Sequence, residues 1–148
     1  MGCHVNDSDL PPSTAEPDRY APLEAFDVGE RSLQLALAAA QIAEEDRGQD
    51  VVVLDLRELT CIFDYFVIAS GTSRRQLHAI SEDIDHKLEG DLGDKRMGIE
   101  GYKESSWILL DYGTVVIHLF DAETRDYYGM EKLWGEAKRV PWQELLKS

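Results

Sequence analysis

Apolar residues first recur at steps of three and four from about Glu30 onward, which is the spacing of one buried helix face. The residues that form this stripe are Leu33, Ala36, Leu37 and Ala40. A helix is therefore expected from about Glu30, with its end at Gly48, because a glycine after a basic last turn is a common helix C-terminus.

Two continuous apolar runs follow this helix, at residues 51–55 and 64–69. Runs of this length are typical of strands that are covered on both faces. Alternation along the second run puts Tyr65, Val67 and Ala69 on one face and Phe66 and Ile68 on the other. The pattern predicts two interior strands with helices packed against them.

The segment Ser70–Ser73 closes the second strand and opens another helix. Gly71 permits a sharp turn, and Thr72 or Ser73 can accept a hydrogen bond from a free first-turn N–H. The helix is expected to end near Gly90, and its buried stripe is Leu77, Ile80, Ile84 and Leu88. Residues 91–106 are expected to form a loop with one short strand at about 97–102.

Two further strands surround a tight turn at Tyr112-Gly113 and must pair antiparallel. Alternation places Trp107, Leu109 and Asp111 on one face of the first strand, and Ile108, Leu110 and Tyr112 on the other. On the second strand Val115, Ile117 and Leu119 oppose Thr114, Val116, His118 and Phe120.

The length of 148 residues suits one α/β domain with an extension. Residues 1–28 hold four of the five prolines, many acids and few large apolar residues, so we expect a disordered acidic leader there. The domain is expected over residues 29–136. Residues 137–148 are expected to form a C-terminal tail with a short amphipathic piece after Pro141.

A formal net charge of -14 disfavours direct nucleic-acid binding, because that affinity comes largely from Lys and Arg, and it favours a basic protein partner. Cys3 and Cys61 form neither a CxxC pair nor a disulfide framework, which fits a reducing cytoplasm. No apolar run reaches the roughly 20 residues that span a bilayer, and the N-terminus does not resemble an export signal.

The turn Gly71-Thr72-Ser73 could hold a phosphate at a helix N-terminus, or it could be a plain helix cap. It lacks the Lys of a Walker loop. A nucleotidyltransferase-like site would also need a pair of carboxylates that share a metal ion. Asp55 and Asp64 precede the turn and no D-x-D follows it, so a nucleotide-binding or transferring enzyme is the alternative hypothesis.

His78, Glu82 and His86 step by four residues and could line one helix face as metal ligands, or they could be a solvated flank. His118 is more often a hydrogen-bonded, partly buried histidine than a base. Four aromatic residues remain that could form an interface or cap the core under the sheet edge: Trp107, Tyr127, Tyr128 and Trp134.

Four motifs, in order and spacing, resemble the ribosomal silencing factor family, which is also called Iojap. They are Gly71-Thr72-Ser73-x-Arg75-Gln76-Leu77, Gly98-Ile99-Glu100-Gly101, Trp107-Ile108-Leu109-Leu110-Asp111-Tyr112-Gly113 with Val115-x-x-His118, and Arg125-x-Tyr127-Tyr128-x-x-Glu131-x-Leu133-Trp134. The resemblance implies a mixed β-sheet with packed helices, similar to nucleotidyltransferases but without their catalytic carboxylates.

The resemblance further implies a factor without enzymatic activity or cofactor that binds the fourteenth protein of the large ribosomal subunit. Such a factor blocks joining of the small subunit and lowers translation when nutrients are short, and free members are often homodimers. By motif match, the resemblance assigns partner binding to Trp107, Asp111, Tyr112, His118, Tyr127, Tyr128, Glu131 and Trp134. Thr114 departs from the family pattern, which commonly has an acid after the turn glycine, so a charge contact there is expected to be absent.

Overall fold

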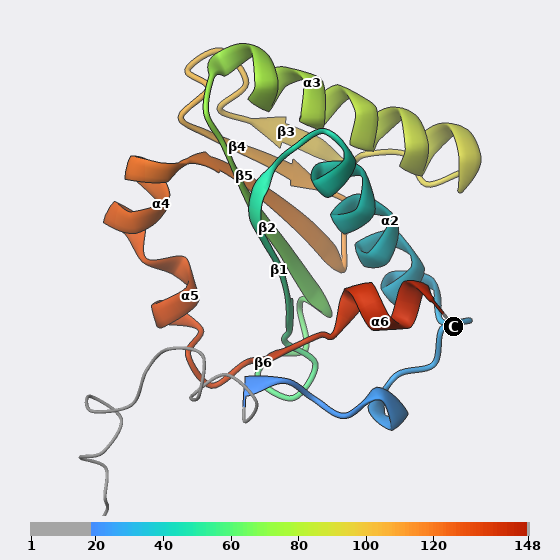
Figure 1. The fold of residues 1–148 in the computed structure, drawn as a ribbon. Coiled ribbons are helices and arrows are strands. Elements are labelled where there is room, and N and C mark those ends of the chain that lie inside the picture. The colour runs from blue at the N-terminus through green and yellow to red at the C-terminus, as the bar shows by residue number, and fades with distance from the viewer. Residues whose placement is uncertain (1–18, 148) are drawn as a thin grey trace, which may run out of the picture.

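A computed structural model describes residues 19–147, which form one six-stranded sheet with helices packed against it (Figure 1). The strand order is β3-β4-β5-β2-β1-β6. The elements in chain order are η3 (Leu23–Ala25), α2 (Arg31–Glu45), β1 (Gln49–Asp55), β2 (Tyr65–Gly71), α3 (Arg74–Asp85), η4 (His86–Asp91), β3 (Gly98–Glu100), β4 (Trp107–Asp111), β5 (Val115–Asp121), α4 (Ala122–Tyr128), α5 (Met130–Leu133), β6 (Lys138–Arg139) and α6 (Trp142–Leu146).

The sheet is mixed, because β2 and β5 pair parallel at its centre whereas its other named strand pairs are antiparallel. The connection from β2 to β5 runs through α3, β3 and β4, so the predicted hairpin of β4 and β5 lies beside β2. The predicted α/β class with packed helices is confirmed, and so is the antiparallel pairing of the hairpin strands.

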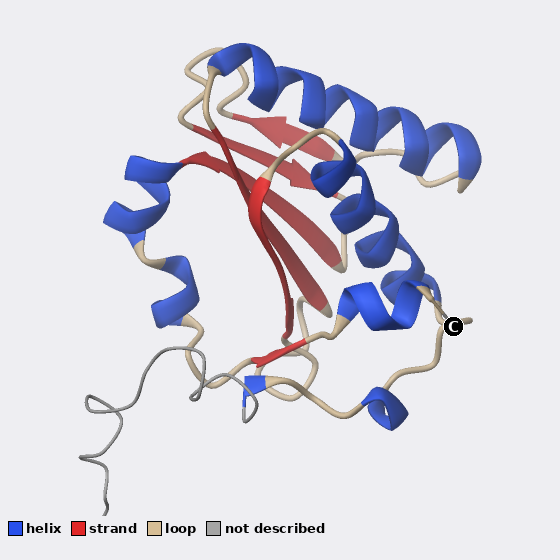
Figure 2. Ribbon diagram, viewed as in Figure 1, coloured by secondary structure: helices blue, strands red, loops and turns tan. Residues whose placement is uncertain are grey.

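The two faces of the sheet are covered unequally. In Figure 2 the helices α2, α3 and α6 lie on one side of the sheet, and α4 and α5 lie on the other. The larger core lies under α2 and α3 and takes in Leu33, Ile80, Ile108, Tyr112 and Ile117. The smaller cluster on the opposite face includes Phe66, Val116, Phe120 and Met130, so the predicted alternation along β2, β4 and β5 is confirmed. The smaller cluster is covered by the short helices α4 and α5, whereas the larger core lies under the long helices α2 and α3.

The helix α2 begins where its apolar stripe predicts, because the Glu30 side chain accepts hydrogen bonds from the N–H groups of Ser32 and Leu33. Its end differs from the prediction. The helix stops at Glu45, and Arg47 takes the left-handed conformation with φ 67°. Gly48 does not take the left-handed conformation. It lets the chain pass close to the last turn of α2, since a Cβ there would lie 2.7 Å from the carbonyl oxygen of Ala43.

Ser73 caps α3 as expected, accepting the N–H of Gln76 at 3.1 Å. The helical run ends at Asp91, close to the expected end near Gly90, but its last turn from His86 is the π-helical η4. This turn keeps Leu88 buried in the larger core.

The loop after η4 contains the predicted short strand, β3, which pairs with β4 at the sheet edge. Gly101 follows this strand with φ 77°. A Cβ at this position would lie 2.0 Å from the carbonyl oxygen of Trp107. Only a glycine therefore lets the loop pass beneath the start of β4.

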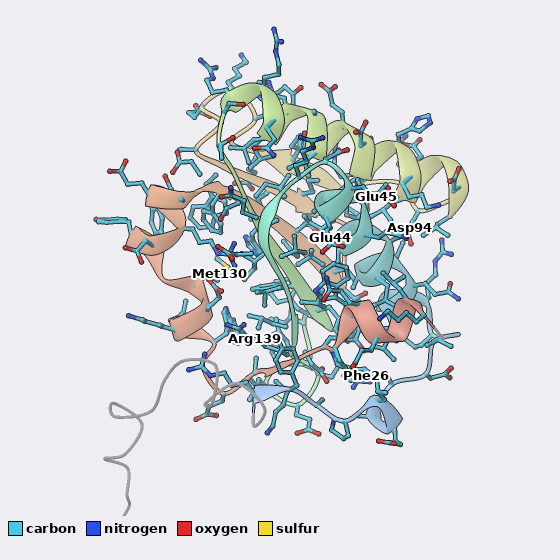
Figure 3. All side chains as sticks on the ribbon, viewed as in Figure 1. Phe26, Glu44, Glu45, Asp94, Met130 and Arg139 are labelled. Carbon is cyan, nitrogen blue, oxygen red and sulfur yellow. The ribbon has the colours of Figure 1, made fainter. Side chains whose placement is uncertain are left out.

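The predicted leader overlaps the folded domain. Residues 1–18 lie outside the described residues, but residues 19–28 pack against the domain. Phe26, which Figure 3 labels beside the η3 segment, is buried, with the guanidinium of Arg57 5.2 Å from its ring centroid. Tyr20 forms a bridge with Arg139. The part of the expected leader that the structure describes, residues 19–28, is therefore anchored to the domain at Ala21 and Phe26.

Residues 137–148 are expected to form a tail, but the described part of this segment, up to Lys147, packs into the domain. β6 pairs with β1 at the sheet edge, and the Trp142 indole N–H donates to the carbonyl oxygen of Val51 at 3.3 Å. Trp142 and Leu145 are buried in the larger core beside α2. Residues 137–147 therefore pack against the same sheet and core as the segment before them.

Candidate functional site

The thinly covered side of the sheet carries a continuous group of rings, which we call the aromatic face. It consists of Phe66, Trp107, His118, Phe120, Tyr128 and Trp134. The ring centroids of Trp107 lie 5.0 Å from Phe120 and 4.8 Å from Tyr128. Those of Phe66 lie 4.6 Å from His118 and 5.8 Å from Trp134. Rings at these separations attract one another beyond their burial of area, which stabilises the packed arrangement.

Strand register explains why these rings meet. Trp107 on β4 stands opposite Phe120 on β5, and His118 on β5 is paired with Ile68 on β2. Successive side chains alternate between the two faces of a sheet, so Phe66, two residues before Ile68, lies on the same face. Three strands thus deliver their rings to one surface.

The segment of α4 and α5 supplies the exposed part of this surface. The Asp121 side chain caps α4 by accepting the N–H of Thr124 at 2.7 Å, and Gly129 ends it with φ 56°. The side chains on either side of Gly129 are open to solvent, with exposed fractions of 81% for Tyr127, 53% for Tyr128 and 75% for Leu133. Exposed aromatic residues of this kind suit a protein contact, because they bury large areas with little loss of conformational freedom.

His118 holds one of the rings in place. Its Nδ1 atom accepts the indole N–H of Trp107 at 3.2 Å. The residue is only 3% exposed, and burial lowers the pKa of its imidazole to about 4. The side chain is therefore neutral at physiological pH, with its remaining proton on Nε2, which has no hydrogen-bond partner within the described chain.

Tyr112 lies apart from the aromatic face, although the family motif assigned it to partner binding. It belongs to the larger core, and its hydroxyl donates to Asp85 Oδ1 at 2.8 Å. Burial, with this hydrogen bond, raises the pKa of the Tyr112 hydroxyl well above its ordinary value. The side chain anchors the end of β4 to α3.

Asp111 and Thr114 shape the hairpin turn. Asp111 is half-buried, and its Oδ1 accepts the N–H of Gly113 at 2.8 Å, where φ is 91°. The Thr114 hydroxyl lies 2.6 Å from that of Ser32 on α2. At the position where the family commonly has an acid, this chain therefore has a neutral side chain that ties the turn to a helix.

Glu131 faces the protein itself. Its two carboxylate oxygens accept hydrogen bonds from Nε and Nη2 of Arg125, each at 3.0 Å. Arg139 also approaches, with Nη2 3.8 Å from Oε2. Although burial raises the pKa of Glu131, the hydrogen bonds and charge of Arg125 outweigh it and leave the pKa below its ordinary value.

Of the eight motif-assigned residues, the structure gathers five on or beside the aromatic face: Trp107, His118, Tyr127, Tyr128 and Trp134. Sequence reasoning did not include Phe66 and Phe120 in the site. Their alternation was visible, but the position of β2 beside β5 was not. Buried Arg125 was also missed, because periodicity in a short polar segment does not show which charged residue turns inward.

Within the Gly71-Thr72-Ser73 turn, Thr72 donates internally and the Ser73 hydroxyl serves as a helix cap. The Thr72 N–H donates to Gln76 Oε1 at 2.6 Å, and Ser73 caps the helix. Asp55, which pairs in register with Tyr65, sits at the opposite end of β2 from Gly71 and binds Arg57 at 2.9 Å. Asp64 directly precedes β2 and so lies at the same end as Asp55. A seven-residue strand spans roughly 20 Å, so neither carboxylate can share a metal with a phosphate at the turn.

His78 and Glu82 are likewise engaged with the neighbouring loop. His78 Nε2 contacts the Tyr102 carbonyl oxygen and Ser105 Oγ, both at 2.7 Å, and Glu82 accepts the Tyr102 hydroxyl. Within residues 19–147, no group of three or more His, Cys, Asp or Glu side chains could hold a metal ion. No helix in this same range is both long and apolar enough for a membrane crossing.

Comparison with known proteins agrees with the motif pattern. Residues 29–148 match the model of the family described as "Ribosomal silencing factor during starvation", so the family domain includes the segment expected to be a tail. The chain is 40% identical over 100 residues to the ribosomal silencing factor RsfS of Bacillus subtilis, covering 67% of this chain and 83% of that protein. It is 33% identical over 123 residues to the chloroplastic protein Iojap of Arabidopsis thaliana, covering 83% of this chain and 51% of that one.

The fold has the same relatives. A crystal structure of a Chromobacterium violaceum protein superposes with a TM-score of 0.67 at 33% identity, covering 74% of this chain and 88% of that chain. The sequence match and the fold match cover the same domain, and the chain belongs to the ribosomal silencing factor family.

Proposed function

We propose that this protein binds the large ribosomal subunit through that subunit's fourteenth protein, and that the bound domain blocks joining of the small subunit. The observation that carries the proposal is the aromatic face with Tyr127 and Tyr128 exposed at its rim. Family membership supports ribosome-associated silencing of translation, and the aromatic face is the part of the domain best suited to the contact.

The charge of the chain favours a basic partner. The net charge is -14, and Glu123 and Asp126 are exposed on α4 beside the tyrosines. Lys and Arg side chains of a partner can pair with these acids at the rim and lie over the Tyr127 and Tyr128 rings. An aromatic centre within a charged rim is the usual composition of a specific protein interface.

The proposed mechanism is steric exclusion and needs no reaction. A domain docked by the aromatic face occupies space that the small subunit needs, and translation falls when nutrients are short because fewer complete ribosomes form. The proposal includes no enzymatic step, no cofactor and no direct nucleic-acid contact. It places the protein in the cytoplasm, where ribosomal subunits meet, and allows a homodimer when the factor is free.

A subunit-joining assay tests this function. Isolated large and small subunits are mixed with increasing protein, and complete ribosomes are measured by light scattering. Saturating protein should suppress joining, and Tyr127→Ala should need at least roughly tenfold more protein, the equivalent of about 1.4 kcal/mol of binding. Glu89→Ala, at an exposed residue of η4, is the matched control and should act as the unchanged protein does. Undiminished joining at saturation would refute the function.

A further inference from the structure

Arg125 is a buried charged side chain at the base of α4, with 8% of its surface exposed. It binds Glu131 through Nε and Nη2, as described above. Nη2 also donates to the Asp50 carbonyl oxygen at 2.8 Å, and Nη1 donates to Ser70 Oγ at 2.9 Å and to the Gln49 carbonyl oxygen at 3.4 Å. A guanidinium has five N–H donors in a fixed plane, and this one makes five hydrogen bonds.

The backbone of β1 is bent to meet this side chain. The pairing of β1 with β2 shifts register between Gln49 and Val52. Within that irregularity Asp50 has φ 52°, a left-handed conformation that costs an L-residue about 1 kcal/mol. The two carbonyl groups that accept hydrogen bonds from Arg125 belong to this bulge, which is the common use of such irregularities to aim a polar group.

The exposed α4–α5 segment has few other anchors. Arg125 is the buried residue of α4, and Met130 is that of α5. Figure 3 shows Met130 between this segment and the sheet. Ring contacts hold Tyr127 and Tyr128, and Arg139 on β6 approaches Glu131. The Arg125 guanidinium links the segment to the ends of β1 and β2 through hydrogen bonds.

We infer that Arg125 is the positioning residue of the proposed ribosome-binding surface, and that Glu131 serves this surface through Arg125 rather than by touching the partner. The effect on ribosome binding rests on the proposed function, whereas the positioning of the α4–α5 segment by Arg125 is a property of the free protein. It changes the role that the family motif assigned to Glu131. The acids that meet the partner are instead the exposed ones on α4, of which Asp126 is an example.

Hydrogen exchange in the free protein tests the geometry without any ribosome. Arg125→Lys keeps the charge but loses the planar fork, so the amides of residues 122–134 should exchange at least roughly tenfold faster while those of α2 keep their rates. Glu131→Gln should give a smaller change in the same residues. The inference would be overturned if both variants left the exchange rates at 122–134 unchanged. It would also be overturned if both variants accelerated exchange in α2 as much as at 122–134.

Binding of large subunits at two salt concentrations tests the role of Glu131. Rim charges that face a partner act on the association rate and its salt dependence, whereas lost positioning acts on dissociation. Glu131→Gln should dissociate several times faster with an unchanged salt dependence. Asp126→Asn, which removes the same charge from an exposed position, should weaken the salt dependence. If Glu131→Gln weakened the salt dependence of association as Asp126→Asn does, the inference would be overturned.

The two tests separate failure of the inference from failure of the function. If the unsubstituted protein does not bind large subunits, the proposed function fails, while hydrogen exchange still decides whether Arg125 positions the α4–α5 segment. If binding is normal but neither variant alters exchange, the function stands and the positioning role of Arg125 is wrong.

Discussion

The indole N–H of Trp107 donates to Nδ1 of His118 across the β4–β5 pair, at 3.2 Å. The bond requires an imidazole whose Nδ1 carries no proton, and burial keeps it so by lowering the pKa of His118 to about 4. A protonated His118 would lose its acceptor and leave a charge among Phe66, Phe120 and Trp107. The aromatic face therefore depends on one neutral histidine.

The stability of the domain should fall with acid because of His118. An unfolded chain takes up the proton near the ordinary histidine pKa of 6.5, whereas the folded chain takes it up only near 4. Unfolding is therefore favoured as pH falls between these values, by on the order of 3 kcal/mol in total, since one pKa unit corresponds to about 1.36 kcal/mol. Urea unfolding at pH 7, 5.5 and 4 measures this loss.

His118→Asn is the matched variant, because its Oδ1, which is bonded to Cγ as the imidazole Nδ1 is, can still accept the Trp107 N–H but does not titrate. The free energy of unfolding of this variant should decline less between pH 6.5 and 4 than that of the unsubstituted protein. Parallel curves for the two proteins would contradict the assignment.

Asp46 should act in the opposite direction. Burial, followed by a hydrogen bond with Asp83 and the charges of Asp83 and Glu45, raises the pKa of Asp46 to about 6 from 3.8. The folded state then holds a proton that the unfolded state releases, so this group destabilises the domain as pH rises from 3.8 to 6. Asp46→Asn should raise the urea midpoint more at pH 7 than at pH 4. Asp126→Asn, at an exposed residue, should shift both midpoints alike.

Two glycines with similar backbone conformations should tolerate alanine differently. Gly93 has φ 71° and open space where a Cβ would lie, so Gly93→Ala should cost only the left-handed conformation, about 1 kcal/mol. Gly101 has φ 77° and would bring its Cβ to 2.0 Å from the Trp107 carbonyl oxygen. Gly101→Ala should therefore cost at least about 2 kcal/mol more, because backbone must move. Equal melting temperatures would refute the close approach.

Periodicity predicted most of the fold, because each long element has one continuous buried side. The stripe of α2, the stripe of α3 and the alternation of β4 and β5 could each be recognised within a single segment. The ends of helices were less predictable, since backbone hydrogen bonds and close approaches decide them, as at Arg47 and Gly48.

The site was only partly predictable for a related reason. Local patterns cannot show that β2 lies parallel beside β5, and this adjacency brings Phe66 next to His118. The same limit hid the partners of Arg125, which are distant along the chain at Gln49, Asp50 and Ser70. Motif resemblance assigned Tyr112 the same role as Tyr127 and Tyr128, because a motif does not show that Tyr112 is buried and the other two are exposed.

Site-specific photo-crosslinking tests the docking surface most directly. A photoreactive phenylalanine analogue is placed at position 127, which is exposed beside the aromatic face, and separately at position 89 on η4. Each protein is irradiated with large ribosomal subunits, and the crosslinked protein is identified by mass spectrometry. Docking by the aromatic face should give a crosslink from position 127 to the fourteenth protein of the large subunit and none from position 89. A crosslink to that protein from position 89, with none from position 127, would contradict it.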